Sequence, residues 1–226
     1  MVAGVREPSR TAFVPAARLS GWVERFAAAH GGQAGLADTD GGLELRMDDG
    51  AVALLSPPWN DDGRPGRGRG PLERLESLAS QERSMGLLLV RRGGYAVGLA
   101  VGGKLLAHKC GTKYVLSRTA AGGQSQHRFA RRRGNQADAL VVKAAGEAAR
   151  IFSGQGSGGQ AFEYLATGGD KSLVEAVLAE SALKPYAARP RLAPLAVADP
   201  NMVVLQRAAA DFCSVRIQVA DPPTLR

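Results

Sequence analysis

The sequence predicts an α/β fold in which a mixed β-sheet is flanked by helices. Short apolar runs separated by glycine turns occur in the middle of the chain, and strand-like and helix-like segments alternate in its second half. Strands joined by tight turns pair antiparallel, whereas strands joined through helices pair parallel, so one sheet is expected to contain both kinds of pairing. A chain of 226 residues with 45% hydrophobic residues is long enough to bury such a core.

The N-terminal portion, residues 1–84, is expected to contain a helix and a hairpin. Apolar residues recur at three- and four-residue spacing over 16–30, which is typical of an amphipathic helix. Two apolar runs, 43–47 and 51–55, flank Asp48-Asp49-Gly50, and this pattern favours a hairpin turn.

A stretch rich in Gly, Arg and Pro follows at residues 61–71. Gly and Pro in this density do not build a packed element, so the stretch is expected to be a loop or a linker, and it is the best candidate for a domain boundary. Its three arginines either contact RNA backbone or only keep the loop solvated: Arg64, Arg67 and Arg69. A short helix is predicted directly after it, over 72–79.

Residues 85–226 are expected to form the second domain, built around the mixed sheet. The domain is expected to begin with a meander of strands joined by glycine turns. A long helix follows, and Gly134 is expected to weaken or kink that helix. The predicted elements, in order, are strands 86–90, 95–101 and 104–108, a helix over 125–152, a strand at 162–166, a helix at 172–181, a strand at 192–197, a helix at 201–212 and a closing strand at 215–219.

Positive charge is concentrated in the middle of the chain. The formal net charge is +8, and no Asp or Glu occurs between Glu82 and Asp138. The basic residues in this stretch are Arg83, Arg91, Arg92, Lys104, Lys109, Lys113, Arg118, Arg128, Arg131, Arg132 and Arg133. Charge of one sign over so long a stretch indicates a phosphate-binding surface, whereas a solvated surface would intersperse both signs.

The composition argues against a membrane or secreted protein. No run of about eighteen apolar residues occurs, and the first ten residues lack the apolar stretch of a signal peptide. Two cysteines, Cys110 and Cys213, are too few for a disulfide scaffold and are interpreted as reduced thiols. The expected compartment is the cytoplasm.

One triplet in the basic stretch can approach RNA closely. Gly122-Gly123-Gln124 lies between a basic strand region and a basic helix. Glycine has no Cβ, so its backbone adopts positive φ and approaches other molecules closely. A backbone N–H there can donate to a developing oxyanion, and the amide of Gln124 can orient a water although it cannot abstract a proton. The same triplet at 158–160 lies in a glycine-rich loop and is interpreted as a spacer.

The helix after the triplet is predicted to hold RNA. Arg128, Arg131 and Arg132 share one face at helical spacing, and the planar guanidinium suits phosphate. A solvated helix face is the alternative. For His127, which could contact RNA, a surface histidine without a catalytic role is the favoured interpretation. The predicted RNA-contacting residues are Lys109, Lys113, Arg118, Ser125, His127, Arg128, Arg131, Arg132 and Arg133. The histidines are scattered without ligand spacing, so neither a metal nor a cofactor is expected.

The segment RTAAGGQSQHRFARRRGNQADALVVKAAGEAARIF resembles the catalytic middle domain of eukaryotic and archaeal class-1 peptide release factors, in which GGQS precedes an RFAR-containing helix. GLLLVRRGGYAVGLAVGGKLLAHK and FEYLATGGDKSLVEAVLAES extend the resemblance over roughly 85–219. It implies an RNase H-like mixed sheet with an exposed GGQ loop leading into a long basic helix. Because residues 1–84 lack a stop-codon-reading motif and no third domain fits, the chain is most similar to the stand-alone bacterial Vms/ANKZF-like release factors.

The resemblance implies a bacterial, cytoplasmic and monomeric enzyme of ribosome-associated quality control. Its activity would be codon-independent hydrolysis of peptidyl-tRNA, and its partners the large ribosomal subunit, at the rRNA of the peptidyl-transferase centre, and peptidyl-tRNA. The catalytic role falls on Gly122, Gly123 and Gln124. Relatives with another residue in place of the middle glycine cut the tRNA near its 3′ end, so an endonuclease is an alternative, although Gly123 favours ester hydrolysis. A non-catalytic ribosome- or RNA-binding module is the other alternative.

Overall fold

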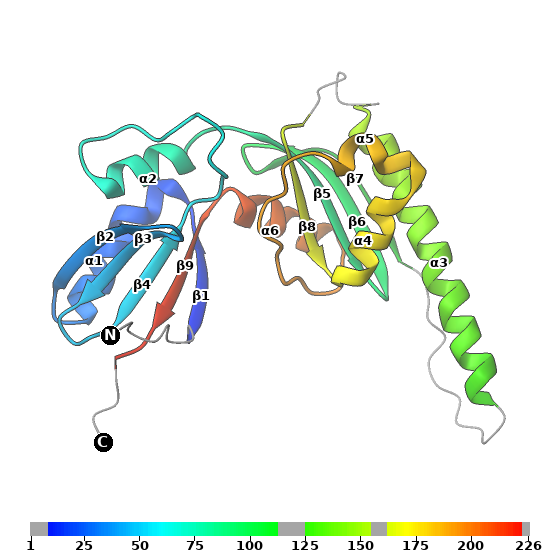
Figure 1. Ribbon diagram of the computed structural model, residues 1–226, viewed down its shortest axis with the longest axis horizontal. Coiled ribbons are helices and arrows are strands. Elements are labelled where there is room, and N and C mark those ends of the chain that lie inside the picture. Colours follow the sequence, from blue (N-terminus) through cyan, green and yellow to red (C-terminus); the bar gives the residue numbers. More distant parts are fainter. Residues whose placement is uncertain (1–8, 113–124, 155–161, 223–226) are drawn as a thin grey trace. The chain divides into compact units, whose positions relative to one another are not determined.

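The computed structural model describes residues 9–112, 125–154 and 162–222, with the side chains of residues 125–136 excepted. The chain forms two compact units (Figure 1): the first contains residues 1–81 and 210–226, and the second contains residues 82–209. Each unit is built on its own sheet with helices packed on it, so the predicted α/β class is confirmed.

The first unit contains a five-stranded antiparallel sheet with the strand order β1-β9-β4-β3-β2. Its elements are β1 (Arg10–Val14), a 3-10 turn η1 (Ala16–Arg18), α1 (Leu19–Ala29), β2 (Gln33–Thr39), β3 (Gly42–Met47), β4 (Val52–Ser56), α2 (Pro71–Ala79) and β9 (Val215–Ala220). The predicted helix and hairpin of this region are therefore confirmed, whereas the strands β1 and β2 were not predicted from the sequence.

Alternation of buried and exposed residues explains how this sheet forms its core. Along β9, Val215, Ile217 and Val219 are buried while the residues between them are half-buried, so one face of the strand points inward. Helices α1 and α2 pack their apolar sides on the same face of the sheet, with Leu19 and Leu75 in the shared core.

The position of β9 differs from the domain division that the sequence suggests. The sequence-based boundary places residues 85–226 together, but β9 pairs with β1 and β4 of the first unit, with Ile217 opposite Ala12 on one side and Leu55 on the other. The reason is that a strand with one apolar face satisfies either sheet, and local periodicity does not identify its partner.

The Gly- and Arg-rich stretch at 61–71 packs against α2 within the first unit rather than linking two domains. The backbone N–H of Arg67 donates to Ser77 Oγ at 3.0 Å, and that of Arg69 donates to Glu73 Oε2 at 2.7 Å. The approach is so close that a Cβ on Gly66 would lie 1.8 Å from the carbonyl oxygen of Arg74. Glycine is therefore needed there for contact with α2.

The second unit contains a four-stranded mixed sheet with the strand order β7-β6-β5-β8. Strands β5, β6 and β7 form the predicted antiparallel meander, and β8 lies parallel to β5. The elements of the unit are β5 (Ser84–Arg91), β6 (Gly94–Val101), β7 (Lys104–Thr112), α3 (Ser125–Phe152), β8 (Tyr164–Gly169), α4 (Lys171–Ala179), a 3-10 turn η2 (Ser181–Leu183), α5 (Lys184–Ala187) and α6 (Met202–Phe212), whose last residues belong to the first unit.

Helices cover both faces of this sheet. Helices α3 and α4 pack on the face that carries Leu88 and Val97. Helix α6 lies on the other face, where a Cβ on Gly98 of β6 would be 3.3 Å from Leu205. The sheet is therefore the middle layer, and its strands β5 and β6 are buried over almost their whole length.

Two further expectations for this unit are settled by the structure. The predicted strand at 192–197 is not continuous, because only Arg191 and Leu195 form isolated parallel bridges, to Leu165 and Gly168. Helix α3 runs without interruption past Gly134. None of the helices in the described part of the chain has both the length and the apolar character needed to cross a membrane.

Candidate functional site

The predicted catalytic triplet lies between two elements of the second unit. Strand β7 ends at Thr112, and helix α3 begins at Ser125, immediately after Gln124. Residues 113–124, which include the triplet, Lys113 and Arg118, lie outside the described residues, as does the second triplet at 158–160. The geometry available for the site is therefore that of its two supports, β7 and α3.

Helix α3 is fixed to the sheet through its C-terminal half. Every third or fourth residue from Leu140 onward is buried, while Val142 and Lys143 on the opposite side are exposed. The buried residues are Leu140, Val141, Ala144, Ala145, Ala148, Ile151 and Phe152. Three of them are alanines, and small side chains let the helix lie close to β6.

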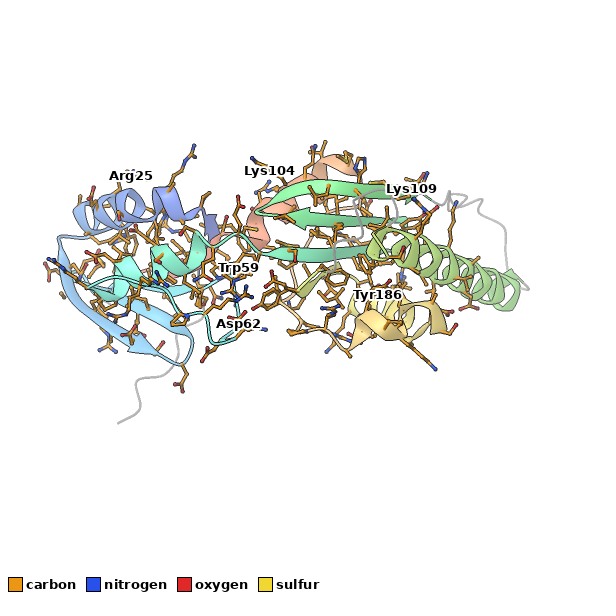
Figure 2. The ribbon with its side chains drawn as sticks, turned by 90° about the horizontal axis from the view of Figure 1, so that it is seen from above. Arg25, Trp59, Asp62, Lys104, Lys109 and Tyr186 are labelled. Atoms are coloured by element: carbon orange, nitrogen blue, oxygen red, sulfur yellow. The ribbon has the colours of Figure 1, made fainter. Side chains whose placement is uncertain are left out.

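The last residue of α3 is held in an aromatic cluster. The ring of Phe152 lies 4.9 Å from Phe162 and 5.5 Å from Tyr186, measured between ring centroids, and Figure 2 shows Tyr186 beside the helix. Gly86 of β5 makes room for these rings, because a Cβ there would be 2.8 Å from Phe162 and 3.0 Å from Phe152. The C-terminal end of α3 is therefore the fixed end.

The N-terminal end of α3 extends beyond the sheet. A helix of 28 residues is about 42 Å long. A strand of eight residues such as β6 is only about 27 Å long, so α3 overhangs the sheet. Figure 1 shows the first turns of α3 past the edge of the sheet. The residue that follows Gln124 is thus placed at the overhanging end.

Of the predicted RNA-contacting residues, the structure describes the side chain of Lys109 alone. Lys109 pairs with Val97, whose side chain faces α3, so Lys109 points to the same side of the sheet, as Figure 2 shows. It is exposed on β7, an edge strand of the sheet. An exposed lysine also protects an edge strand from pairing with another chain. The position of Lys109 is therefore compatible with an RNA contact and with protection of this edge.

The other predicted RNA contacts stay predictions. Helix α3 does begin at Ser125, so its backbone is helical through the arginine-rich turns. Helical spacing then brings the three arginines at 128, 131 and 132 to one side of the helix. Side chains in this part of α3 are outside the described residues, and so are those of Ser125, His127 and Arg133.

A buried tyrosine beside the end of β7, the strand that leads to the triplet, was not predicted from the sequence. Tyr95 of β6 is buried between the sheet and α3, and its hydroxyl accepts and donates no hydrogen bond within the described residues. Burial raises the pKa of Tyr95 above its ordinary value, and the nearby carboxylate of Glu147 raises it further. No local pattern in the sequence singles out Tyr95, because its contact with Gly111 joins two different strands.

The titratable groups that the structure describes around β7 do not form a catalytic set of their own. Burial raises the pKa of the Cys110 thiol on β7, which disfavours a reactive thiolate. His108 is exposed on β7, and His30 lies in the first unit, where it bonds Asp49 at 2.7 Å. Within the described ranges, no group of three His, Cys, Asp or Glu side chains could hold a metal ion.

Comparison with known proteins assigns the chain to a family. The family described as Actinobacteria/chloroflexi VLRF1 release factor matches residues 83–218. The chain belongs to this family, which gives it a release-factor role in ribosome quality control and confirms the relationship expected from the sequence. A solved structure described as the Vms1 mitochondrial localization core has a TM-score of 0.43 and 12% sequence identity, over 81% of this chain and 77% of that chain. No curated protein matches.

Proposed function

We propose that the protein is a codon-independent peptidyl-tRNA hydrolase that releases nascent chains from stalled or obstructed large ribosomal subunits. The observation that carries the proposal is the position of Gly122-Gly123-Gln124 directly before α3, in a chain of a release factor family. The proposed partners are peptidyl-tRNA and the rRNA of the peptidyl-transferase centre, and the proposed compartment is the cytoplasm.

The form of α3 supports this proposal. A helix whose far end is packed on a sheet and whose near end overhangs it can carry a short segment into a narrow cavity without moving the core. The cost of ordering that segment is smaller when one of its ends is a rigid helix, because fewer residues must be fixed on binding. The unit is therefore suited to presenting residues 122–124 at a distance from its own body.

The chemistry proposed for the triplet needs no other side chain of this protein. In ester hydrolysis a water attacks the carbonyl carbon, and the tRNA ribose oxygen leaves with a proton. The amide of Gln124 would orient the water, and a backbone N–H of the triplet would donate to the developing oxyanion or to the leaving oxygen. Ribosomal RNA would supply the remaining groups.

The decisive experiment is a release assay on isolated large subunits that carry peptidyl-tRNA. Gln124→Ala is expected to reduce the rate of peptide release by about a hundredfold or more, as expected when an orienting group is removed. Binding of the variant to the large subunit should change less than threefold, because phosphate contacts dominate such affinity. The chain offers a matched control in Gln160→Ala, which alters the second triplet and should release peptide at the wild-type rate.

The size of the tRNA product separates the proposed reaction from endonucleolytic cleavage. Hydrolysis leaves a tRNA with its full 3′ end, whereas cleavage near the acceptor end yields a shorter tRNA. A shortened product, or release by Gln124→Ala at the wild-type rate, would overturn the proposal. If the wild-type protein bound large subunits but never released peptide, the protein would be a binding module instead.

A further inference from the structure

The first unit contains a groove between α1 and the edge strand β1, with a volume of about 330 Å³. The family match begins at residue 83, so it assigns no role to the N-terminal residues that form this groove. The lining side chains that matter below are Arg10, Trp22, Arg25, Phe26 and His30.

Three aromatic rings form a column along α1 and line the groove. Trp22, Phe26 and His30 recur every four residues, so they share one face of the helix. The rings of Trp22 and Phe26 are stacked with their centroids 4.9 Å apart and their planes at 17°, and Phe26 and His30 are 4.5 Å apart. Phe26 is buried, whereas Trp22 is half-buried, so the column ends in an accessible indole.

The charge of the groove is positive. Arg10 and Arg25 are both exposed, and neither forms an ion pair with another described residue. Gly21 leaves space for the Arg25 guanidinium, whose Nη1 lies 3.3 Å from the position of a Cβ at Gly21, and Figure 2 shows Arg25 on the outer side of α1. Among the described residues, no acidic side chain lines the groove.

One carboxylate, that of Asp49, contacts the His30 end of the column and is already engaged. Asp49 accepts a hydrogen bond from the backbone N–H of Ala51 at 2.9 Å, and its other oxygen is 2.7 Å from His30 Nδ1. This pair fixes the histidine ring at the inner end of the column. Arg10 and Arg25 therefore set the charge of the lining that an approaching ligand meets.

We propose that this groove binds an unpaired nucleotide of an RNA strand, with its base stacked on Trp22 and its phosphate held between Arg10 and Arg25. A flat indole that is stacked on Phe26 on one side offers an apolar face to any base on the other. The planar guanidinium groups match the geometry of phosphate oxygens. An acidic peptide would use the arginines but not the aromatic face, so the two features together favour RNA. The inference does not depend on catalysis by the second unit.

Tryptophan fluorescence gives a local measurement of this binding. The chain has two tryptophans, Trp22 and Trp59, and both belong to the first unit. Trp59 is only 2% exposed, so a stacked base should quench the emission of Trp22 alone. Titration of the full-length protein with a single-stranded RNA of about ten nucleotides, a length within the usual range of such sites, should quench the emission in a saturable way.

Substitutions of exposed arginines test the phosphate contact without disturbing the core. The double variant Arg10→Gln and Arg25→Gln should lower the RNA affinity measured by quenching by about tenfold or more, because two charge-assisted contacts are lost. Arg46→Gln is the matched control, because Arg46 is an exposed arginine of β3 in the same unit, 67% exposed and outside the groove. It should bind RNA with unchanged affinity.

The aromatic contact is tested separately by Trp22→Leu, followed through the anisotropy of a fluorescein-labelled RNA. Loss of one stacked base should weaken binding to the first unit by about tenfold. Because the basic second unit also attracts RNA, ultraviolet crosslinking and peptide mapping of the same samples should show a crosslink on residues 19–29 in the wild type that disappears in the variant. Circular dichroism of the variant confirms that the fold is kept.

Two control ligands and the crosslinking map distinguish an RNA strand from a mononucleotide and from an acidic peptide as the occupant of the groove. Adenosine monophosphate contains the base and the phosphate of the proposed site but no neighbouring nucleotides, so it should quench Trp22 only at a much higher concentration than the RNA does. Equal affinity of the mononucleotide would overturn the assignment to an RNA strand. Polyglutamate should not quench Trp22, and if it did so with the affinity of RNA, the groove would be a peptide site. Absence of any crosslink on α1 would also overturn the proposal, whether or not the second unit releases peptide.

Discussion

Tyr95 lies directly on Gly111: a Cβ on Gly111 would be 2.5 Å from the phenol ring and 2.6 Å from the hydroxyl oxygen of Tyr95. These residues face each other across β6 and β7, at the end of β7 that leads to the predicted catalytic triplet. A glycine is needed at this position because the tyrosine ring occupies the space that any side chain would fill. The contact therefore joins the packing of α3 to the strand that precedes the triplet.

Gly111→Ala is expected to lower the free energy of unfolding by about 1–3 kcal/mol, because an added methyl group in a filled space forces a shift of its neighbours. It should also slow peptide release, since the end of β7 is displaced. Urea unfolding and the release assay measure the two effects. Gly93→Ala is the control, because nothing lies within 4 Å of a Cβ there and Gly93 has no positive φ. An equal loss of stability in both variants would contradict the packing argument.

Two buried tyrosines of the second unit make a matched comparison. Tyr164 accepts a hydrogen bond from Arg83 Nη1 at 2.7 Å in a buried setting, whereas Tyr95 has no such bond within the described residues. Tyr164→Phe should lower the free energy of unfolding by about 1–3 kcal/mol, while Tyr95→Phe should leave it unchanged or raise it by about 1 kcal/mol. Urea denaturation of both variants checks this order, and the reverse order would contradict it.

The same tyrosine predicts sensitivity to alkaline pH. The pKa of Tyr95 is raised in the folded state, first by burial and then by Glu147, above the ordinary value of 10.0. The neutral phenol is thus favoured in the folded protein, and its contribution to stability is complete below pH 10.0 and is lost as the pH rises through the folded-state pKa. Tyr95→Phe should therefore resist unfolding above pH 10.0 better than the wild type, as measured by circular dichroism.

Helix α3 gives a test of the anchoring that the proposed mechanism requires. Ala148 is fully buried against the sheet, so Ala148→Leu should lift the helix, lower the free energy of unfolding by about 1–3 kcal/mol and reduce peptide release. Gly146 is on the exposed side with nothing within 4 Å of a Cβ, so Gly146→Ala should raise the stability by about 0.5–1 kcal/mol. A loss of stability in Gly146→Ala would show that this side of α3 is covered.

The N-terminus of α4 depends on one carboxylate. Asp170 accepts hydrogen bonds from the backbone N–H groups of Ser172 and Leu173, at 3.0 and 3.4 Å, and from the Ser172 hydroxyl at 2.7 Å. Asp170→Ala should lower the free energy of unfolding by about 1 kcal/mol. The Ser172 hydroxyl, followed by the Leu173 N–H, lowers the pKa of Asp170 below 3.8, so its contribution is present above that pH and is lost as the pH falls. Asp170→Asn should keep most of the cap without this acid dependence.

Local patterns were sufficient to predict most elements of the second unit. The meander β5–β7 follows from its glycine turns, and α3 from its apolar stripe, because both signals lie within the segment itself. The fold of the first unit could be predicted only in part. Strand β2 is exposed at almost every position and shows no alternation, and the five residues of β1 become a strand through pairing with β9, some 200 residues later.

The candidate site shows the same division between local and tertiary information. The triplet and its flanking arginines are identified by residue type and order, which the sequence contains completely. The contact of Tyr95 with Gly111 and the packing of loop 61–71 on α2 depend on which segments meet in space. The glycines of 61–71 are expected from the sequence to be loop residues, but in the structure Gly66, like Gly111, permits close approach.

The final prediction tests the place of β9 in the first unit. Ile217 is fully buried between Ala12 and Leu55, so Ile217→Ala should lower the stability of that unit by about 2–4 kcal/mol. Both tryptophans report on this unit, so the urea midpoint followed by tryptophan emission should fall. Leu165, an equally buried residue of β8, provides the control. Leu165→Ala should reduce peptide release but leave the urea midpoint of the tryptophan transition nearly unchanged. If Ile217→Ala left the tryptophan transition unchanged while Leu165→Ala shifted it, residues 215–220 would belong with the second unit, as the periodicity of the chain alone had suggested.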